Sequence, residues 1–186
     1  MNQLVLKHHL LYNSQLHQID HDSKGIMIKK LKENLDFSLT SDQLKTIEEI
    51  SSDQSKPNKM LRLLQGDVGS GKTIVALFAM MQCLENNKRS ILMAPTEILA
   101  EQHFNTIVKI VNSMDLTCSL ITSSTKDSHN FDADILIGTH ALFQEKVSFA
   151  NIGLVVIDEQ HKFGVHQRIL LNEKAGNECD VLLMLS

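Results

Sequence analysis

The segment from Gly66 to Thr73 constrains this chain more than any other feature, and it reads Gly-Asp-Val-Gly-Ser-Gly-Lys-Thr. It fits the phosphate-binding pattern G-x-x-x-x-G-K-[ST], between an apolar run at 60–64 and an apolar stretch at 74–81 that is typical of a helix. Glycines let the backbone turn its N–H groups toward a phosphate, and the start of the following helix adds a positive partial charge. The segment therefore predicts a strand, a phosphate-binding loop and a helix, in that order.

The residue types in this loop suggest separate roles. Lys72 is expected to reach the β- and γ-phosphates of a nucleotide, and the Thr73 hydroxyl is expected to hold Mg²⁺. The other predicted nucleotide-binding residues of the loop are Gly66, Asp67, Val68, Gly69, Ser70 and Gly71. A glycine-rich turn without a ligand is the alternative, and the agreement of spacing, the Lys-Thr pair and the flanking segments disfavours it.

A second candidate site begins where an apolar segment at 154–158 ends in two adjacent carboxylates, Asp158 and Glu159. Ligands of open α/β sheets bind at the carboxyl ends of the strands, so this pair is expected on the same edge as the loop. Asp158 is expected to hold Mg²⁺ through its water shell, and Glu159 to orient and deprotonate the water that attacks the γ-phosphate. Lys72, Asp158 and Glu159 are therefore the predicted catalytic residues, with ATP and Mg²⁺ as the predicted cofactors.

Short apolar segments alternate with helical patterns along the chain. Strands are expected near 60–64, 90–94, 116–122, 134–138, 154–158 and 181–185. Helices are expected near 41–51, 72–85, 96–111, 139–144 and 165–171. Strands that are apolar throughout and alternate with helices are typical of a parallel sheet with both faces covered. We therefore expect an α/β fold with a mostly parallel central sheet and helices on both faces.

The N-terminal segment, residues 1–36, differs from this pattern. Leucine and isoleucine spacing predicts a helix over 4–19 and a second helical piece over 26–35, with a turn at 20–25 between them. The expected organisation is a helical N-terminal arm outside the sheet, followed by a nucleotide-binding lobe over 37–186.

Composition limits the remaining possibilities. Aromatic residues make up 4% of the chain, so the core must be aliphatic and rich in methionine. The net charge of −4 gives no overall attraction to nucleic acid, so any such contact must be local. No apolar run approaches the roughly 18 residues of a membrane helix, and no signal peptide is visible. The cysteines at 83, 118 and 179 show neither metal nor disulfide spacing, so a reducing cytoplasm is expected.

Asp158-Glu159-Gln160-His161 resembles motif II of the superfamily 2 helicases and translocases. Three further segments line up in the order of that family: 39–43 resembles its glutamine motif, 94–103 its motif Ia and 137–142 its motif Ib. The resemblance implies a RecA-like P-loop NTPase lobe in which Gln43 reads the adenine edge. It also implies contacts to a nucleic-acid backbone from motifs Ia and Ib, namely from Pro95, Thr96, Glu97, Thr139 and His140.

Within this superfamily the chain resembles the RecG helicases, bacterial proteins that remodel stalled replication forks. The resemblance is carried by 64–73, 95–103 and 158–168. The transcription-repair coupling translocases are near relatives, and Gln160 and Glu97 favour RecG over them. RecG-like proteins usually carry arginine at the position of Lys162, and this change keeps the charge but loses the planar fork of donors.

The resemblance extends from about residue 37 to the end of the chain and implies the first motor lobe of a larger helicase. Nothing resembles the N-terminal wedge domain of the family, and no second lobe with its arginine finger is seen. We expect a fragment or the product of a split gene that binds ATP and Mg²⁺ but hydrolyses ATP slowly. The expected partners are branched DNA, the second lobe and the wedge domain, and the expected processes are replication, recombination and repair. An inactive nucleotide-binding remnant or interaction module, and a lobe of a transcription-repair coupling translocase, remain as alternatives.

Overall fold

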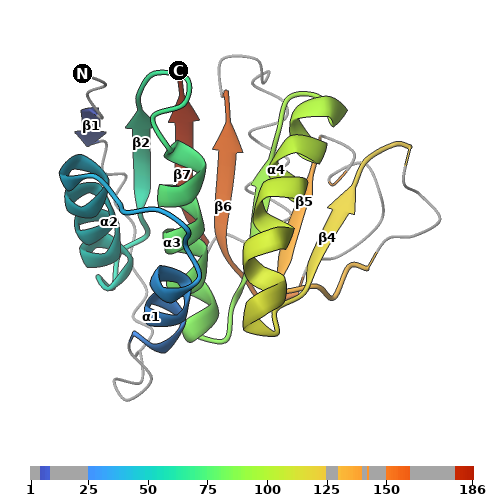
Figure 1. Ribbon diagram of the computed structural model, residues 1–186, viewed down its shortest axis with the longest axis horizontal. Helices are drawn as coiled ribbons and strands as arrows, with labels where there is room; N and C mark the ends of the chain where they lie inside the picture. The colour runs from blue at the N-terminus through green and yellow to red at the C-terminus, as the bar shows by residue number, and fades with distance from the viewer. Residues whose placement is uncertain (1–4, 9–24, 125–129, 140–141, 143–149, 160–178) are drawn as a thin grey trace.

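A single sheet organises the chain, in a computed structural model that describes residues 5–8, 25–124, 130–139, 142, 150–159 and 179–186. Figure 1 shows the order of the strands across the sheet. The seven strands lie in the order β1 (Val5–His8), β2 (Leu61–Gln65), β7 (Asp180–Leu185), β6 (Ile152–Asp158), β3 (Arg89–Met93), β5 (Ile135–Gly138) and β4 (Cys118–Ile121). Every pairing is parallel except that of β1 with β2, which confirms the predicted mostly parallel sheet.

Four helices of the described chain lie along one face of this sheet (Figure 1). They are α1 (Ile26–Glu33), α2 (Ser41–Gln54), α3 (Lys72–Glu85) and α4 (Glu97–Val111), the last followed by a short 3-10 turn, η2 (Asn112–Met114). Side chains fix two of the starts: Thr40 forms a capping box with Gln43 at α2, and Thr96 caps α4 by accepting from Leu99 N. The helices predicted at 139–144 and 165–171 lie largely outside the described residues.

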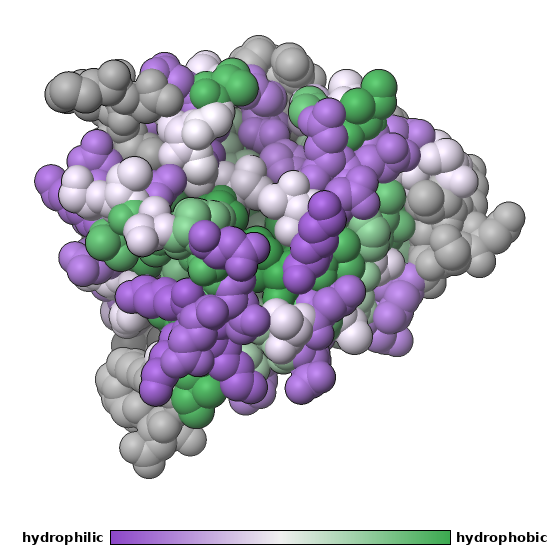
Figure 2. Space-filling view, in the orientation of Figure 1, coloured by the Kyte–Doolittle hydropathy of each residue, from purple (hydrophilic) through white to green (hydrophobic). Residues whose placement is uncertain are grey.

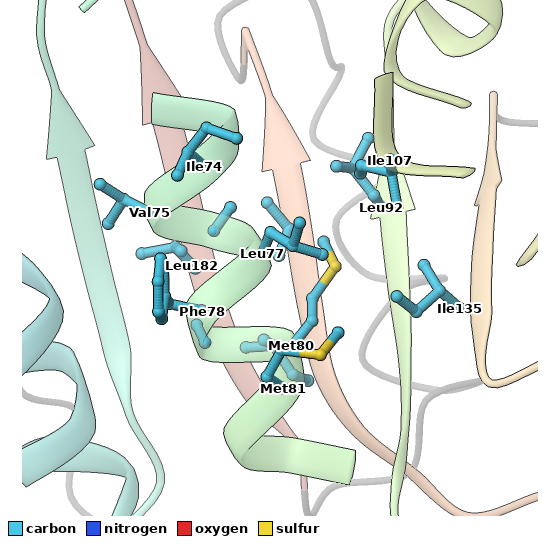
Figure 3. Close-up of a cluster of buried hydrophobic side chains, with 14 of the residues drawn as sticks. Ile74, Val75, Leu77, Phe78, Met80, Met81, Leu92, Ile107, Ile135 and Leu182 are labelled. Carbon is cyan, nitrogen blue, oxygen red and sulfur yellow. The ribbon is translucent and has the colours of Figure 1, made fainter. Parts of the chain in front are cut away.

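The core explains why the strands are apolar throughout. Alternate strand residues such as Leu92, Val156 and Leu182 are buried with α3 and α4 on the helical face, and Figure 3 shows part of this cluster around α3. Their neighbours Ile91 and Val155 belong to a second buried cluster. Both faces of the central strands β6, β3 and β5 are therefore removed from water, as the sequence pattern predicted, whereas alternate residues of β2, β4 and β7 are half-buried.

Polar side chains cover much of the helical face in Figure 2, and apolar residues show between them near the middle. Within the described chain, no helix combines the length and the apolar character that crossing a membrane requires. Cys83 and Cys179 are buried, Cys118 is half-buried, and all three are free thiols. Burial raises the pKa of the Cys83 thiol to about 12, so it behaves as an inert core residue.

The predicted N-terminal helix is wrong for residues 5–8, which form β1 and belong to the sheet. Val5 lies opposite Gln65 and His8 opposite Arg62, so β1 covers what would otherwise be an open edge of β2. An open edge presents unpaired N–H and C=O groups, and pairing them outweighs local helix propensity. The rest of the predicted helix lies outside the described residues.

The second N-terminal piece forms a helix as predicted, and α1 packs against α3. The Glu85 carboxylate, at the end of α3, accepts hydrogen bonds from the backbone N–H groups of Gly25, Met27 and Ile28 at 2.8–3.2 Å. A carboxylate at a helix N-terminus satisfies unpaired donors and complements the helix dipole. This contact fixes α1 to the lobe.

Candidate nucleotide-binding site

The two predicted motifs lie at the carboxyl edge of the sheet, on either side of one strand. The phosphate-loop segment follows β2, the acidic pair ends β6, and β7 runs between these strands. Gly66 N donates to Leu185 O at 3.1 Å, and Glu159 N donates to Met184 O at 2.9 Å. Since neighbouring strands are about 4.8 Å apart, the two motifs begin about 10 Å from each other.

The loop adopts the conformation that its glycines allow. Gly69 and Gly71 have φ values of 81° and 85°, in the left-handed region that other residues rarely occupy. A Cβ atom on Gly71 would lie 2.2 Å from Gln43 Nε2, so this position also needs glycine for space. The loop leads into α3 at Lys72, where the first turn of the helix presents unpaired N–H groups toward the edge of the sheet.

Lys72 is buried, and its ammonium is held by the loop itself. Its Nζ atom donates to Gly66 O at 2.6 Å and to Asp67 O at 3.0 Å. Among the described residues, no carboxylate forms an ion pair with it. The buried hydroxyl of Ser70 likewise has no hydrogen-bond partner among the described residues. A cation and a hydroxyl held without an anionic partner fit a site for phosphate oxygens.

The predicted metal ligands converge on a histidine from a third element. His103 of α4 places Nε2 2.8 Å from Asp158 Oδ2 and Nδ1 3.5 Å from Thr73 Oγ1. The arrangement brings α3, α4 and β6 together at one point. Asp158 is buried, and hydroxyl and carboxylate oxygens are the ligands that Mg²⁺ prefers, so the donor set fits this ion.

Sequence reasoning left open whether His103, in the segment that resembles motif Ia, has a contact role or is an ordinary helix histidine, and it did not connect His103 with Asp158. Its contact with Asp158 joins residues 55 positions apart, and periodicity cannot reveal such a contact. The one available signal was the place of His103 within that segment.

Glu159 has an unusual backbone. Its φ of 51° is left-handed, which costs a residue with a Cβ atom about 1–2 kcal/mol. Strained backbones concentrate at functional sites because the surrounding structure must hold them in place. Here the hydrogen bond from Glu159 N to Met184 O fixes the turn directly after β6.

Gln43 joins the start of α2 to the phosphate-loop segment. Its Nε2 group donates to Ser70 O at 2.9 Å, while its Oε1 atom accepts from Thr40 N at 2.9 Å. Both ends of the amide are therefore engaged within the protein. Its contact with an adenine remains a prediction.

The residues predicted to contact nucleic acid are spread over two strand ends. Thr96 is exposed while its hydroxyl accepts from Leu99 N, and the Glu97 carboxylate accepts from Ser123 N and Ser124 Oγ at 3.0 Å each. Pro95 is half-buried before them, Thr139 is buried after β5, and His140 lies outside the described residues. Their contacts with a nucleic-acid backbone remain predictions.

A parallel α/β sheet with a glycine loop, a buried lysine and a strand-ending Asp-Glu pair on one edge defines a P-loop nucleotide-binding lobe. The family model described as DEAD/DEAH box helicase matches residues 40–184, and the chain belongs to this family.

Its relatives include the RecG helicases. The chain is 46% identical to ATP-dependent DNA helicase RecG of Synechocystis over 169 residues, which cover 86% of this chain and 20% of that protein. It is also 46% identical to RecG of Bacillus subtilis over 160 residues, which cover 81% of this chain and 23% of the relative. The chain thus spans about a fifth to a quarter of the length of these relatives.

The chain is also similar to solved structures. A structure of RecG bound to a three-way DNA junction matches with a TM-score of 0.72 and 36% identity, over 89% of this chain and 23% of the other. A chain from a Saccharomyces cerevisiae structure of Dbp5 bound to Nup159 and Gle1 matches with a TM-score of 0.66 and 18% identity, over 85% of this chain and 45% of the other. The second match shows the fold alone.

Proposed function

We propose that this chain is the ATP-binding motor lobe of a RecG-like ATP-dependent DNA helicase that remodels branched DNA in the cytoplasm. The observation that carries the proposal is the contact of both Thr73 and Asp158 with His103, at the edge where the buried Lys72 has no carboxylate partner among the described residues. The similarity to RecG proteins supports the choice of DNA helicase within the family.

The residues at the carboxyl edge of the sheet have separate roles in this proposal. The N–H groups of the loop and of the first turn of α3 bind the phosphates, and Lys72 moves from its loop carbonyls to phosphate oxygens. Thr73 and Asp158 hold Mg²⁺, which when bound neutralises charge on the β- and γ-phosphates. Glu159 orients the attacking water and accepts its proton.

Nucleotide hydrolysis by this lobe alone is expected to be slow. The resemblance places an arginine finger in a second lobe, and such a residue contributes about 10³–10⁵ in rate. The second lobe and a wedge domain are therefore proposed partners. We propose branched DNA as a further partner, because the RecG of the similar solved structure is bound to a three-way DNA junction. Among the described residues predicted to contact the backbone, Thr96 is the exposed one.

ATP turnover by the purified 186-residue chain, without DNA and then with a forked duplex, tests the proposal. We expect slow turnover that the forked duplex increases and that Glu159→Gln abolishes, while Mg²⁺-dependent ATP binding survives in that variant. Binding without any turnover would indicate a nucleotide-binding module instead. Stimulation by a stalled RNA polymerase rather than by forked DNA would indicate the transcription-repair coupling type, and failure to bind ATP would refute the proposal.

A further inference from the structure

We propose that His103 is a positioning residue that orients both Mg²⁺ ligands, Thr73 and Asp158, and so sets the affinity for Mg²⁺-bound nucleotide. The inference rests on the proposed function and deepens it. It assigns a role to a side chain of α4 that belongs neither to the phosphate loop nor to the acidic pair.

The hydrogen-bonding chemistry determines which proton each ring nitrogen carries. A carboxylate only accepts, so the 2.8 Å contact requires that His103 Nε2 donates to Asp158 Oδ2. In the neutral ring, Nδ1 is then an acceptor that faces the Thr73 hydroxyl at 3.5 Å. Thr73 can donate its proton to this nitrogen, which leaves its oxygen lone pairs free for a metal ion.

The position of the ring makes this role possible. The side chain is largely buried, with 12% of its surface exposed, and it comes from the middle of α4, which packs on the sheet. Because α4 packs on the sheet, it holds the His103 ring against both Thr73 and Asp158. A partner that holds a metal ligand through a hydrogen bond typically changes metal affinity by about 10–100-fold when it is removed.

Nucleotide affinity measured with Mg²⁺ and with a chelator tests the role. We expect His103→Ala to weaken binding of a fluorescent ATP analogue about tenfold in Mg²⁺ and to leave binding in chelator unchanged. Gln102→Ala, at an exposed neighbouring position of α4, is the matched control and should match the original chain in both conditions. An equal loss in both conditions, or no loss in either, would overturn the proposal.

Two conservative variants separate the two contacts. Glutamine places an amide N–H near the position of Nε2, and asparagine places its amide near Nδ1. We expect His103→Gln to recover most of the Mg²⁺-dependent affinity and His103→Asn to recover less, because the contact with Asp158 is the shorter one. Recovery by asparagine alone would contradict this assignment.

The ring can also be observed without nucleotide. Nitrogen NMR of the nucleotide-free chain should show the hydrogen bond from His103 Nε2 to the Asp158 carboxylate, and Asp158→Asn should change that signal. Protonation at Nδ1 alone would refute the proposal even in a protein that binds ATP. If the original chain fails to bind ATP while the ring shows the expected signal, the proposed function fails and the contact of His103 with Asp158 stands.

Discussion

Buried charges occur in two regions of this lobe, and the two regions treat them differently. Where α2 packs on β2, the Arg62 guanidinium is 3% exposed and pairs with the carboxylates of Asp53 and Glu49. At the carboxyl edge of the sheet, Lys72 is 9% exposed and, among the described residues, meets only carbonyl oxygens of its own loop. A cation paired with carboxylates is committed to the fold, whereas one held by neutral carbonyls is available to an incoming anion.

Two acidic groups on the first side of this comparison, Asp53 and Asp180, differ in whether a cation pairs with them. Burial alone would raise the pKa of Asp53, but hydrogen bonds from Arg62 and Lys56 hold that pKa below its usual value. Asp180, at the start of β7, has no such ion pair among the described residues, and burial raises its pKa to about 6. The comparison predicts which variants reduce stability and which reduce ligand binding.

Removing Arg62, the buried partner of Asp53, should have the largest effect on stability. Arg62→Met is expected to lower the free energy of unfolding by about 3–5 kcal/mol, because it leaves Asp53 buried without its main cation. Urea denaturation measures this loss. The double variant Arg62→Met/Asp53→Leu should recover much of it, and a double variant as unstable as the single one would show that the pair is not the cause.

Asp180 should make stability depend on pH. Its pKa is about 6 in the folded chain against a usual value of 3.8, so the folded state binds the extra proton between these values. The stabilisation is complete below pH 3.8 and is lost as the pH rises through about 6, which amounts to about 3 kcal/mol. Asp180→Asn keeps an acceptor for Met60 N and should lack this loss. Parallel pH profiles for both proteins would contradict the assignment.

Lys72→Ala should separate binding from stability at the other region. We expect ATP affinity to fall about 10–100-fold, because a charge-assisted contact with the phosphates is lost. The free energy of unfolding should fall by about 1–3 kcal/mol, less than in Arg62→Met, because Lys72→Ala leaves two loop carbonyls without their donor but leaves no buried carboxylate unpaired among the described residues. Calorimetric titration and thermal unfolding measure the two effects. A Lys72→Ala protein that binds ATP as well as the original chain would refute the site.

Two glycines of the same loop allow the smallest comparison. Gly69→Ala and Gly71→Ala both place a Cβ atom at positive φ, but only Gly71 has a neighbour, Gln43 Nε2, in the space that this atom would fill. We expect Gly71→Ala to cost about 1 kcal/mol more stability, because Gln43 must give up its bond to Ser70 O. Adding Gln43→Ala should lower the free energy of unfolding less in the Gly71→Ala chain than in the original chain. Equal losses for the two glycine variants would show that the contact contributes nothing.

Local patterns predicted most of the strands and the main helices of the described chain. The apolar segment at 154–158 and the helix that starts at Lys72 lie where expected, because burial on both faces and a glycine loop leave a signature within a few residues. The edge that holds Lys72, Asp158 and Glu159 also followed from the rule that strand ends carry the ligands. Local patterns gave the wrong prediction for residues 5–8. These residues form a strand because they pair with the backbone groups of β2, which lies nearly sixty positions away in the sequence.

The sequence by itself determined the phosphate loop, the acidic pair and the parallel α/β class, since each depends on residues that are neighbours along the chain. Only the tertiary structure decided that His103 lies between Thr73 and Asp158 and that Gln43 bonds to the loop at Ser70. Such contacts depend on the packing of separate helices against one sheet. Packing is set by the summed shapes of many side chains, and a linear pattern does not record it.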